Sequence, residues 1–170
     1  MKNIILFFLV GSVIFMAACA PEPSNSYGDG ESEIKGLSVA DSMWGRPSWI
    51  IKADSSKVKP GNTAASFKKP VLTLYGKNGK VNSIITADEG KADGAAGTGE
   101  LSGSVKVISK EENMTLKTSR LFYNSKKNRI WSDSRVEIQR GKAVVTGRSF
   151  VSNLDFSEIE IKKQETRMLN

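Results

Sequence analysis

A short apolar motif that recurs along the chain constrains the fold more than any other feature. Its copies are IIKAD at 50–54, IITAD at 84–88, LKTSR at 116–120 and VVTGR at 144–148. Between them runs a second series, LTL at 72–74, VKV at 105–107, VEI at 136–138 and IEI at 159–161. Alternation of apolar and polar residues is typical of a strand with one buried face. The sequence therefore predicts a stack of strand–turn–strand units, each too small to bury its apolar face alone.

Turn signals separate these strands. Asn78-Gly79 lies between two apolar runs and is the strongest hairpin signal in the chain. The stretches 110–113, 125–128 and 140–142 have the composition of further turns, and the glycine-rich stretch 90–99 is predicted to be a loop at the rim of the sheet. No segment has a sustained helical periodicity, so we expect a single all-β domain over residues 34–162 and a polar tail over 163–170.

The phase of each strand decides which side chains face inward. If Leu116 points inward, Lys117 points outward, whereas the opposite phase would bury a lysine without a partner. The same phase in the first copy of the motif would turn Lys52 inward, so this phase fits the first copy less well. The inward residues predicted on this basis are Ile50, Leu72, Leu74, Ile84, Val105, Val107, Leu116, Phe122, Val136, Ile138, Val144 and Phe150. Two such apolar files give either a packed sandwich or an open groove.

The amino terminus has the features of an exported lipoprotein. Lys2 precedes an apolar run over 4–16, which is shorter than the about 20 residues of a membrane span. This pattern predicts a signal peptide over 1–18, and the sequence Met16-Ala17-Ala18-Cys19 resembles a lipobox in which Cys19 becomes the lipidated first residue. Residues 19–33 are rich in Pro, Ser and Gly and are predicted to form a flexible tether.

The composition argues against catalysis. The chain contains no histidine, and its one cysteine is assigned to lipid, so the usual bases, nucleophiles and transition-metal ligands are missing. Asp54 and Asp88 occupy the same place in the repeat. A role as turn residues at the ends of strands explains this more simply than a role as a catalytic pair. We expect no enzymatic activity, no cofactor and no metal. The formal charge of +7 suits phosphate or anionic lipid, while an exported protein meets little nucleic acid.

Taken in order, several segments resemble the LptC family, the periplasmic component of the lipopolysaccharide export transporter. They are WIIKAD, PVLTLYGKNGK, SIITADEGKAD, LSGSVKVISKEENMTLKTSRLFYN and SRVEIQRGKAVVTGRSF, within residues 37–161. The resemblance implies a twisted, open antiparallel β-jellyroll whose apolar groove holds the acyl chains of lipopolysaccharide. It also implies that the protein sits on the permease subunits of an inner-membrane ABC transporter and passes its cargo to a periplasmic bridge protein of the same fold.

The chain departs from the family at its amino terminus, because known members carry an uncleaved transmembrane helix in place of a lipobox. We expect a lipid anchor in the inner membrane, although Ala20 after the cysteine would direct an enteric lipoprotein to the outer membrane. The alternative function is that of an envelope lipoprotein with a structural or assembly role, which acts through its sheet edges and carries no lipid. A fully packed core would favour that alternative.

Two further expectations concern the rim and the edge. Arg120 and Arg148 occupy one position of the repeat. Their guanidinium groups either meet the phosphates of a lipid head group or form a salt-bridge ladder with Asp88. The strand at 154–161 ends the repeat and is predicted to be an exposed edge that receives a strand from a partner.

Overall fold

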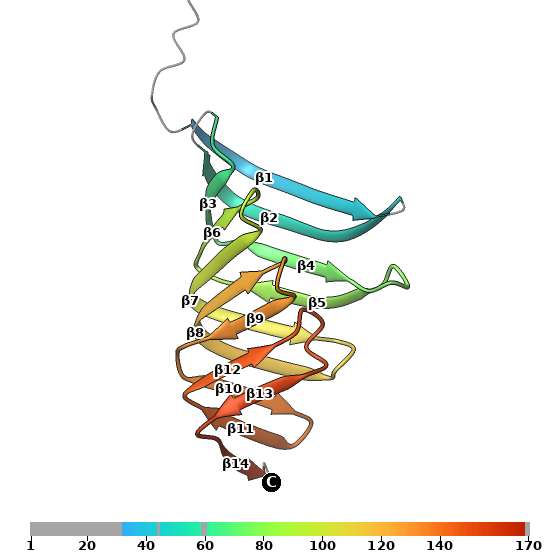
Figure 1. The fold of residues 1–170 in the computed structure, drawn as a ribbon, viewed down its shortest axis with the longest axis vertical. Helices are drawn as coiled ribbons and strands as arrows, with labels where there is room; N and C mark the ends of the chain where they lie inside the picture. Colours follow the sequence, from blue (N-terminus) through green and yellow to red (C-terminus); the bar gives the residue numbers. More distant parts are fainter. Residues whose placement is uncertain (1–31, 44, 59–60, 169–170) are drawn as a thin grey trace, which may run out of the picture.

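Fourteen β-strands form one continuous antiparallel sheet in the computed structural model, which describes residues 32–43, 45–58 and 61–168 (Figure 1). The strands are β1 (Ser32–Met43), β2 (Arg46–Val58), β3 (Ala64–Lys68), β4 (Val71–Tyr75), β5 (Val81–Thr86), β6 (Glu89–Asp93), β7 (Thr98–Ser109), β8 (Met114–Asn124), β9 (Arg129–Ser132), β10 (Val136–Arg140), β11 (Ala143–Gly147), β12 (Ser149–Ser152), β13 (Ile159–Lys162) and β14 (Glu165–Met168). No helix in this part of the chain is long and apolar enough to cross a membrane.

The sheet folds over into two layers that face each other. The first layer follows the order β1-β2-β4-β5-β7-β8-β10-β11-β14, and the second contains β3, β6, β9, β12 and β13. The strands β2, β7 and β8 are long and take part in both layers, so the two layers join along these strands (Figure 1). This arrangement confirms the prediction of a twisted, open antiparallel jellyroll built from strand–turn–strand units.

A glycine allows β7 to turn from one layer into the other. Gly103 has a φ of +93° and lies at the register shift between Ser102 and Val105. A Cβ atom at this position would collide with the carboxylate of Asp88, which accepts a hydrogen bond from the Ser104 backbone N–H at 2.7 Å. The bend therefore needs both a positive φ and the absence of a side chain.

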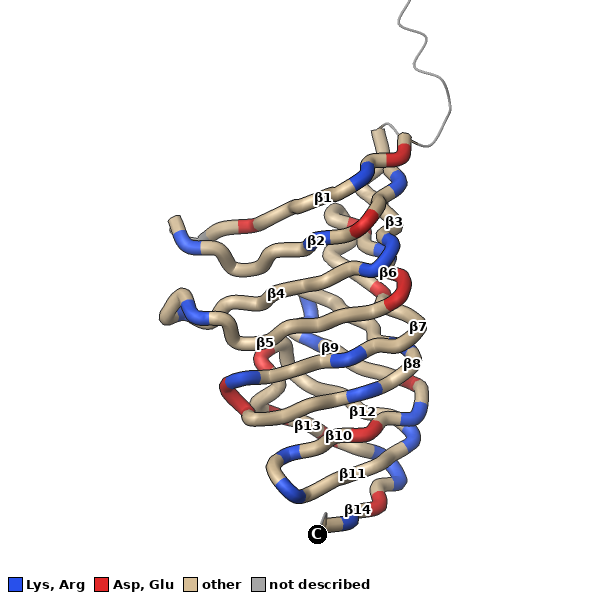
Figure 2. Tube along the Cα trace, turned by 180° about the vertical axis from the view of Figure 1, so that it is seen from behind, with Lys and Arg blue, Asp and Glu red and all other residues tan. Residues whose placement is uncertain are grey.

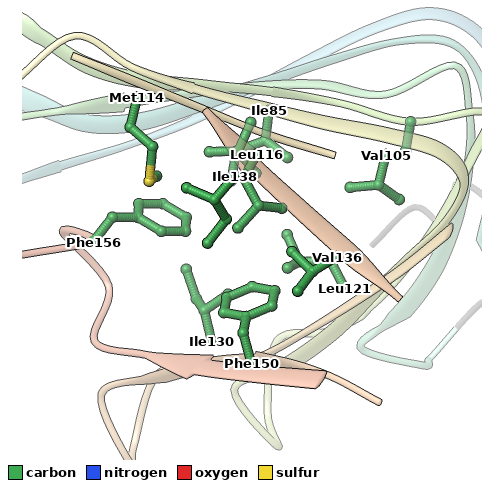
Figure 3. Packing of buried hydrophobic residues seen from close by; sticks show 12 residues of the cluster. Ile85, Val105, Met114, Leu116, Leu121, Ile130, Val136, Ile138, Phe150 and Phe156 are labelled. Atoms are coloured by element: carbon green, nitrogen blue, oxygen red, sulfur yellow. The ribbon is translucent and has the colours of Figure 1, made fainter. Parts of the chain in front are cut away.

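The hydrophobic core lies between the two layers toward the carboxy-terminal end (Figure 3). The first layer contributes Leu116 and Ile138, the second contributes Ile130 and Phe150, and Phe156 enters from the loop after β12. Burying each of these large side chains contributes about 1.5–3 kcal/mol to stability. This end of the molecule is a packed sandwich.

The core corrects the predicted phase at four positions. Cross-strand pairing places Ile85, not Ile84, beside Leu72 and Val107 on the inner face, and it places Ile51, not Ile50, opposite Leu72. An Ile-Ile doublet carries no alternation of its own. The structure resolves the ambiguity by turning Lys52 outward and burying Ala53, because an unpaired buried lysine is costly.

The other two corrections lie in β8 and β11. Phe122 faces the outside of the second layer, where its ring stacks on Trp131 with centroids 5.3 Å apart. Val144 is buried but is not part of the core cluster. Its cross-strand partners are Gln139 and Arg167, and it is the next residue, Val145, that lies opposite Ile138 of the core.

Two predicted non-strand segments are strands in the structure. The glycine-rich stretch contains β6, which pairs with both β3 and β7. Residues 163–170 were expected to be a tail, but Glu165–Met168 form β14 and pair with β11. In both cases a neighbouring strand supplies hydrogen bonds that the local sequence does not reveal.

Candidate functional site

A row of inward side chains crosses the first layer, one residue from each strand. Successive cross-strand partners in this inner row are Val39, Ile51, Leu72, Ile85, Val107, Leu116 and Ile138. Their exposure changes along the row: Leu116 and Val107 are 0% exposed and Ile85 2%, whereas Val39 is 40% exposed. Ile51 and Leu72 lie between these extremes. The interior is therefore packed at one end and accessible at the other.

A second inward row widens the accessible part. Trp49 pairs with Leu74, and both side chains are only partly buried. Together with Val39, Ile51 and Leu72 they form an apolar surface on the inner faces of β1, β2 and β4, which we call the open end. An apolar surface of this kind, continuous with a core, is suited to hydrocarbon chains.

The side of the open end nearest the bend is closed by β2 and β3. Phe67 is buried there, beside the Ser56 side chain with which it pairs across the strands. The hydroxyl of Ser56 is the one buried side-chain polar atom without a hydrogen-bond partner among the described residues.

The loop between β12 and β13 covers part of the packed core. Phe156 is completely buried and packs in the core cluster with Met114 and Phe150 (Figure 3). Asp155 holds the loop in shape, because its carboxylate accepts hydrogen bonds from the backbone N–H and the hydroxyl of Ser157, at 3.0 and 2.7 Å. The hydrogen bond from the Ser157 backbone is the main reason that the pKa of Asp155 lies below its usual value.

The predicted groove residues thus fall into three groups. Leu72 and Leu74 lie at the open end, and Val105, Val107, Leu116, Val136, Ile138 and Phe150 lie in the packed core. Ile50, Ile84, Phe122 and Val144 line neither. Ile51 and Trp49 at the open end and Phe156 in the core are not among the residues predicted from the sequence. Alternation around Lys52 was the available signal for Ile51, whereas Phe156 lies in a polar loop and has no such signal.

The two candidate head-group arginines do not line the interior. Arg120 lies on the outer face, where it forms salt bridges with Glu100 at 3.2 Å and Asp133 at 3.7 Å and sits 5.6 Å from the ring centroid of Phe122. The predicted ladder between Arg120 and Asp88 is therefore wrong, because Asp88 binds the backbone of Ser104 instead. Arg148 is exposed at the corner between β11 and β12.

Three strands are free edges in the described part of the chain. β1 pairs only with β2, β13 only with β12, and β14 only with β11. The predicted edge at 154–161 corresponds to β13, which begins at Ile159. One free edge thus lies at the amino-terminal end of the molecule and two lie at the carboxy-terminal end (Figure 1).

These features define a two-layer antiparallel jellyroll with an apolar interior that is open at one end and free sheet edges at both. The family model "Lipopolysaccharide-assembly, LptC-related" matches residues 40–168. The chain belongs to this LptC family and is therefore a component of lipopolysaccharide assembly.

A solved structure shows the same fold. The crystal structure of LptH from Pseudomonas aeruginosa, the LptA-homologous periplasmic component of its lipopolysaccharide transport device, superposes with a TM-score of 0.56 at 11% identity. The match covers 72% of this chain and 95% of LptH. No curated protein matches the chain in sequence.

Proposed function

We propose that this protein is a periplasmic lipopolysaccharide carrier. It receives lipopolysaccharide from the permease subunits of an inner-membrane ABC transporter, shields the acyl chains at the open end, and passes the lipid to a periplasmic bridge protein of the same fold. The observation that carries the proposal is the inner row, whose side chains are apolar throughout but become more exposed to solvent toward β1.

Partial cover suits a carrier. Each methylene group removed from water contributes about 0.8 kcal/mol, so a fully closed pocket for several acyl chains would hold them almost irreversibly. An open end that shields only part of each chain binds the lipid and still allows its release. The chain has no nucleotide-binding motif, and the energy for transport comes from the transporter.

Transfer uses the free edges. An exposed strand has unpaired N–H and C=O groups, so a partner strand can extend the sheet and continue the apolar interior into the next molecule. β1 would face the transporter side, and β13 and β14 would face the bridge protein.

A lipid anchor holds the carrier at a membrane. The proposed lipidation site, Cys19, and residues 19–31 of the predicted tether lie outside the described residues, whereas Ser32 and Glu33, also predicted as tether, begin β1. We propose an anchor in the inner membrane, close to the transporter, with the outer membrane as the alternative that Ala20 leaves open.

One observation favours a second candidate. The carboxy-terminal half contains a buried hydrophobic core, to which Phe150 and Phe156 contribute the largest side chains. An envelope lipoprotein that acts only through its sheet edges would have such a core. In that case the open end would be covered by a protein partner and would bind no lipid.

Tryptophan fluorescence tests the proposal on the full chain. A variant that keeps Trp49 as its only tryptophan reports on the open end, and a matched variant that keeps only Trp131 reports on the outer face. Lipopolysaccharide with brominated acyl chains should quench Trp49 strongly and Trp131 weakly. Equal quenching, or none, would overturn the carrier function.

A further inference from the structure

Two hairpin turns touch each other beside the open end. Arg46 begins β2 after the first turn, and Lys77 and Lys80 belong to the turn between β4 and β5. The Arg46 Nη1 atom donates a hydrogen bond to the backbone carbonyl of Lys77 at 3.4 Å. A Cβ atom on Gly79 would lie 3.9 Å from the Arg46 side chain. We call Arg46, Lys77 and Lys80 the cationic lip.

The three cations of the lip have no direct ion-pair partner among the described residues. No salt bridge in the described part of the chain involves any of its three side chains. The neighbouring turn differs, because there Lys110 is followed by Glu111 and Glu112, and Glu112 forms a salt bridge with Arg140 at 3.1 Å. Figure 2 shows the basic residues at the ends of these hairpins.

Two carboxylates lie near the lip, and both have other partners. Asp41 on β1 accepts a hydrogen bond from the Ser42 backbone N–H at 2.9 Å. Asp155 is held by Ser157, and the positive charge of Lys77 adds a small part to the lowering of the Asp155 carboxyl pKa.

The lip adjoins the apolar surface. Arg46 precedes Trp49 on β2, and Lys77 follows Leu74 beyond the end of β4, so both strands lead directly from an inward apolar side chain to a cation. An amphiphile with its hydrocarbon on Trp49 and Leu74 would place its polar head group at the lip. Arginine and lysine together suit phosphate, because the guanidinium group can bind two phosphate oxygens at once.

We propose that the cationic lip binds the phosphate groups of the lipid whose acyl chains occupy the open end. The inference rests on the proposed carrier function and assigns its head-group site to Arg46, Lys77 and Lys80 in place of Arg120 and Arg148. Acyl chains provide most of the affinity, and the lip selects phosphorylated amphiphiles and sets their orientation.

The test compares two lipids and two variants of the full chain. The lipids are bisphosphorylated lipid A and the same lipid after removal of both phosphates. One variant changes Arg46, Lys77 and Lys80 to Gln. The control changes Lys52, Lys106 and Lys127 to Gln and removes the same charge from exposed sites away from the lip.

The wild-type protein and the control should bind the phosphorylated lipid about tenfold more tightly than the dephosphorylated one, since three exposed charge contacts contribute about 1.4 kcal/mol in total. The lip variant should lose most of this preference and keep its affinity for the dephosphorylated lipid. An equal loss in the control, or an unchanged preference in the lip variant, would overturn the inference and leave the carrier function standing. If the wild type binds neither lipid, both fail.

Discussion

Gly103 and Asp88 show how single residues set the shape of the molecule. The jellyroll needs β7 to pass from one layer to the other, and the chain turns where a glycine with positive φ lies against a carboxylate that binds the next backbone N–H. Both layers of the interior depend on this bend.

The first prediction concerns the glycine. We expect Gly103→Ala to destabilise the protein by about 2 kcal/mol or more, because the new Cβ adds a collision with Asp88 to the strain of a positive φ. Gly141 is the matched control: its φ is +58°, but nothing lies within 4 Å of an added Cβ. Gly141→Ala should cost about 1 kcal/mol. Urea unfolding measures both, and equal losses would show that the contact with Asp88 is unimportant.

The second prediction concerns pH. The carboxyl pKa values of Asp88, Glu89, Asp93 and Asp155 are lowered in the folded protein, chiefly by hydrogen bonds to backbone N–H groups, and in Glu89 by Lys68. Such groups contribute stability that is fully present above their unfolded pKa of about 4 and is lost as the pH falls through the folded value. The urea midpoint should therefore fall on acidification below about pH 4.

Substitution identifies the groups responsible. Asp155→Asn should weaken this pH dependence. Glu160→Gln should leave it unchanged, since the Glu160 carboxylate makes no hydrogen bond or salt bridge with any described residue. A stability that is flat between pH 5 and pH 3, or an Asp155 variant with the wild-type profile, would contradict the assignment.

At the scale of elements, alternation in the sequence predicts some strands and not others. In LTL, VKV and VEI the polar residue between two apolar ones fixes the inward face, and Leu72, Val105 and Ile138 all lie in the core or against it. In an Ile-Ile doublet either face is apolar, so the choice depends on pairing with strands far away in the sequence.

Other differences between the predicted and the observed structure also arise from contacts between residues that are far apart in the sequence. Gly90 lies in a glycine-rich stretch that resembles a loop, but in the structure it packs closely in β6, where an added Cβ would lie 3.0 Å from Leu101 and 3.2 Å from Pro70. Arg120 pairs with Glu100 because β7 and β8 align them, and no spacing within either strand shows this. The open end was likewise not predictable, since partial exposure depends on what covers an apolar residue.

A third prediction concerns the loop that covers part of the packed core. Phe156→Ala should destabilise the protein by about 3–5 kcal/mol, because it leaves a cavity beside Met114 and Phe150. Ile108→Ala removes an exposed apolar side chain on the outer face and should cost less than about 1 kcal/mol. Guanidinium unfolding provides the comparison, and a small loss for Phe156 would show that this end is not packed.

A fourth prediction concerns the carboxy-terminal edges. A photoreactive residue at Glu160 on β13 or Arg167 on β14 should crosslink to the bridge protein, because a partner strand would lie beside these edges. The control is Lys106, which is exposed on the inner strand β7 between β5 and β8. Crosslinks that form as readily at Lys106 would exclude strand addition at this end.

At the scale of the whole molecule, the structure separates a packed core from an accessible apolar surface. The carboxy-terminal half holds the packed core, while the amino-terminal half carries the same apolar rows without full cover and ends in a cationic lip. Free edges at both ends allow the sheet to continue into neighbouring proteins. In a row of such molecules, each protein would shield part of the lipid, and each would be stabilised by its own core.

The most direct test of the carrier function is photocrosslinking to lipopolysaccharide in cells. Leu72 and Thr73 are adjacent on β4 and point to opposite faces, so a photoreactive residue at each position compares the interior with the outer surface at the same depth. If the interior holds acyl chains, we expect abundant lipopolysaccharide adducts at position 72 and few at position 73. Equal adducts at the two positions, or none at position 72, would contradict it.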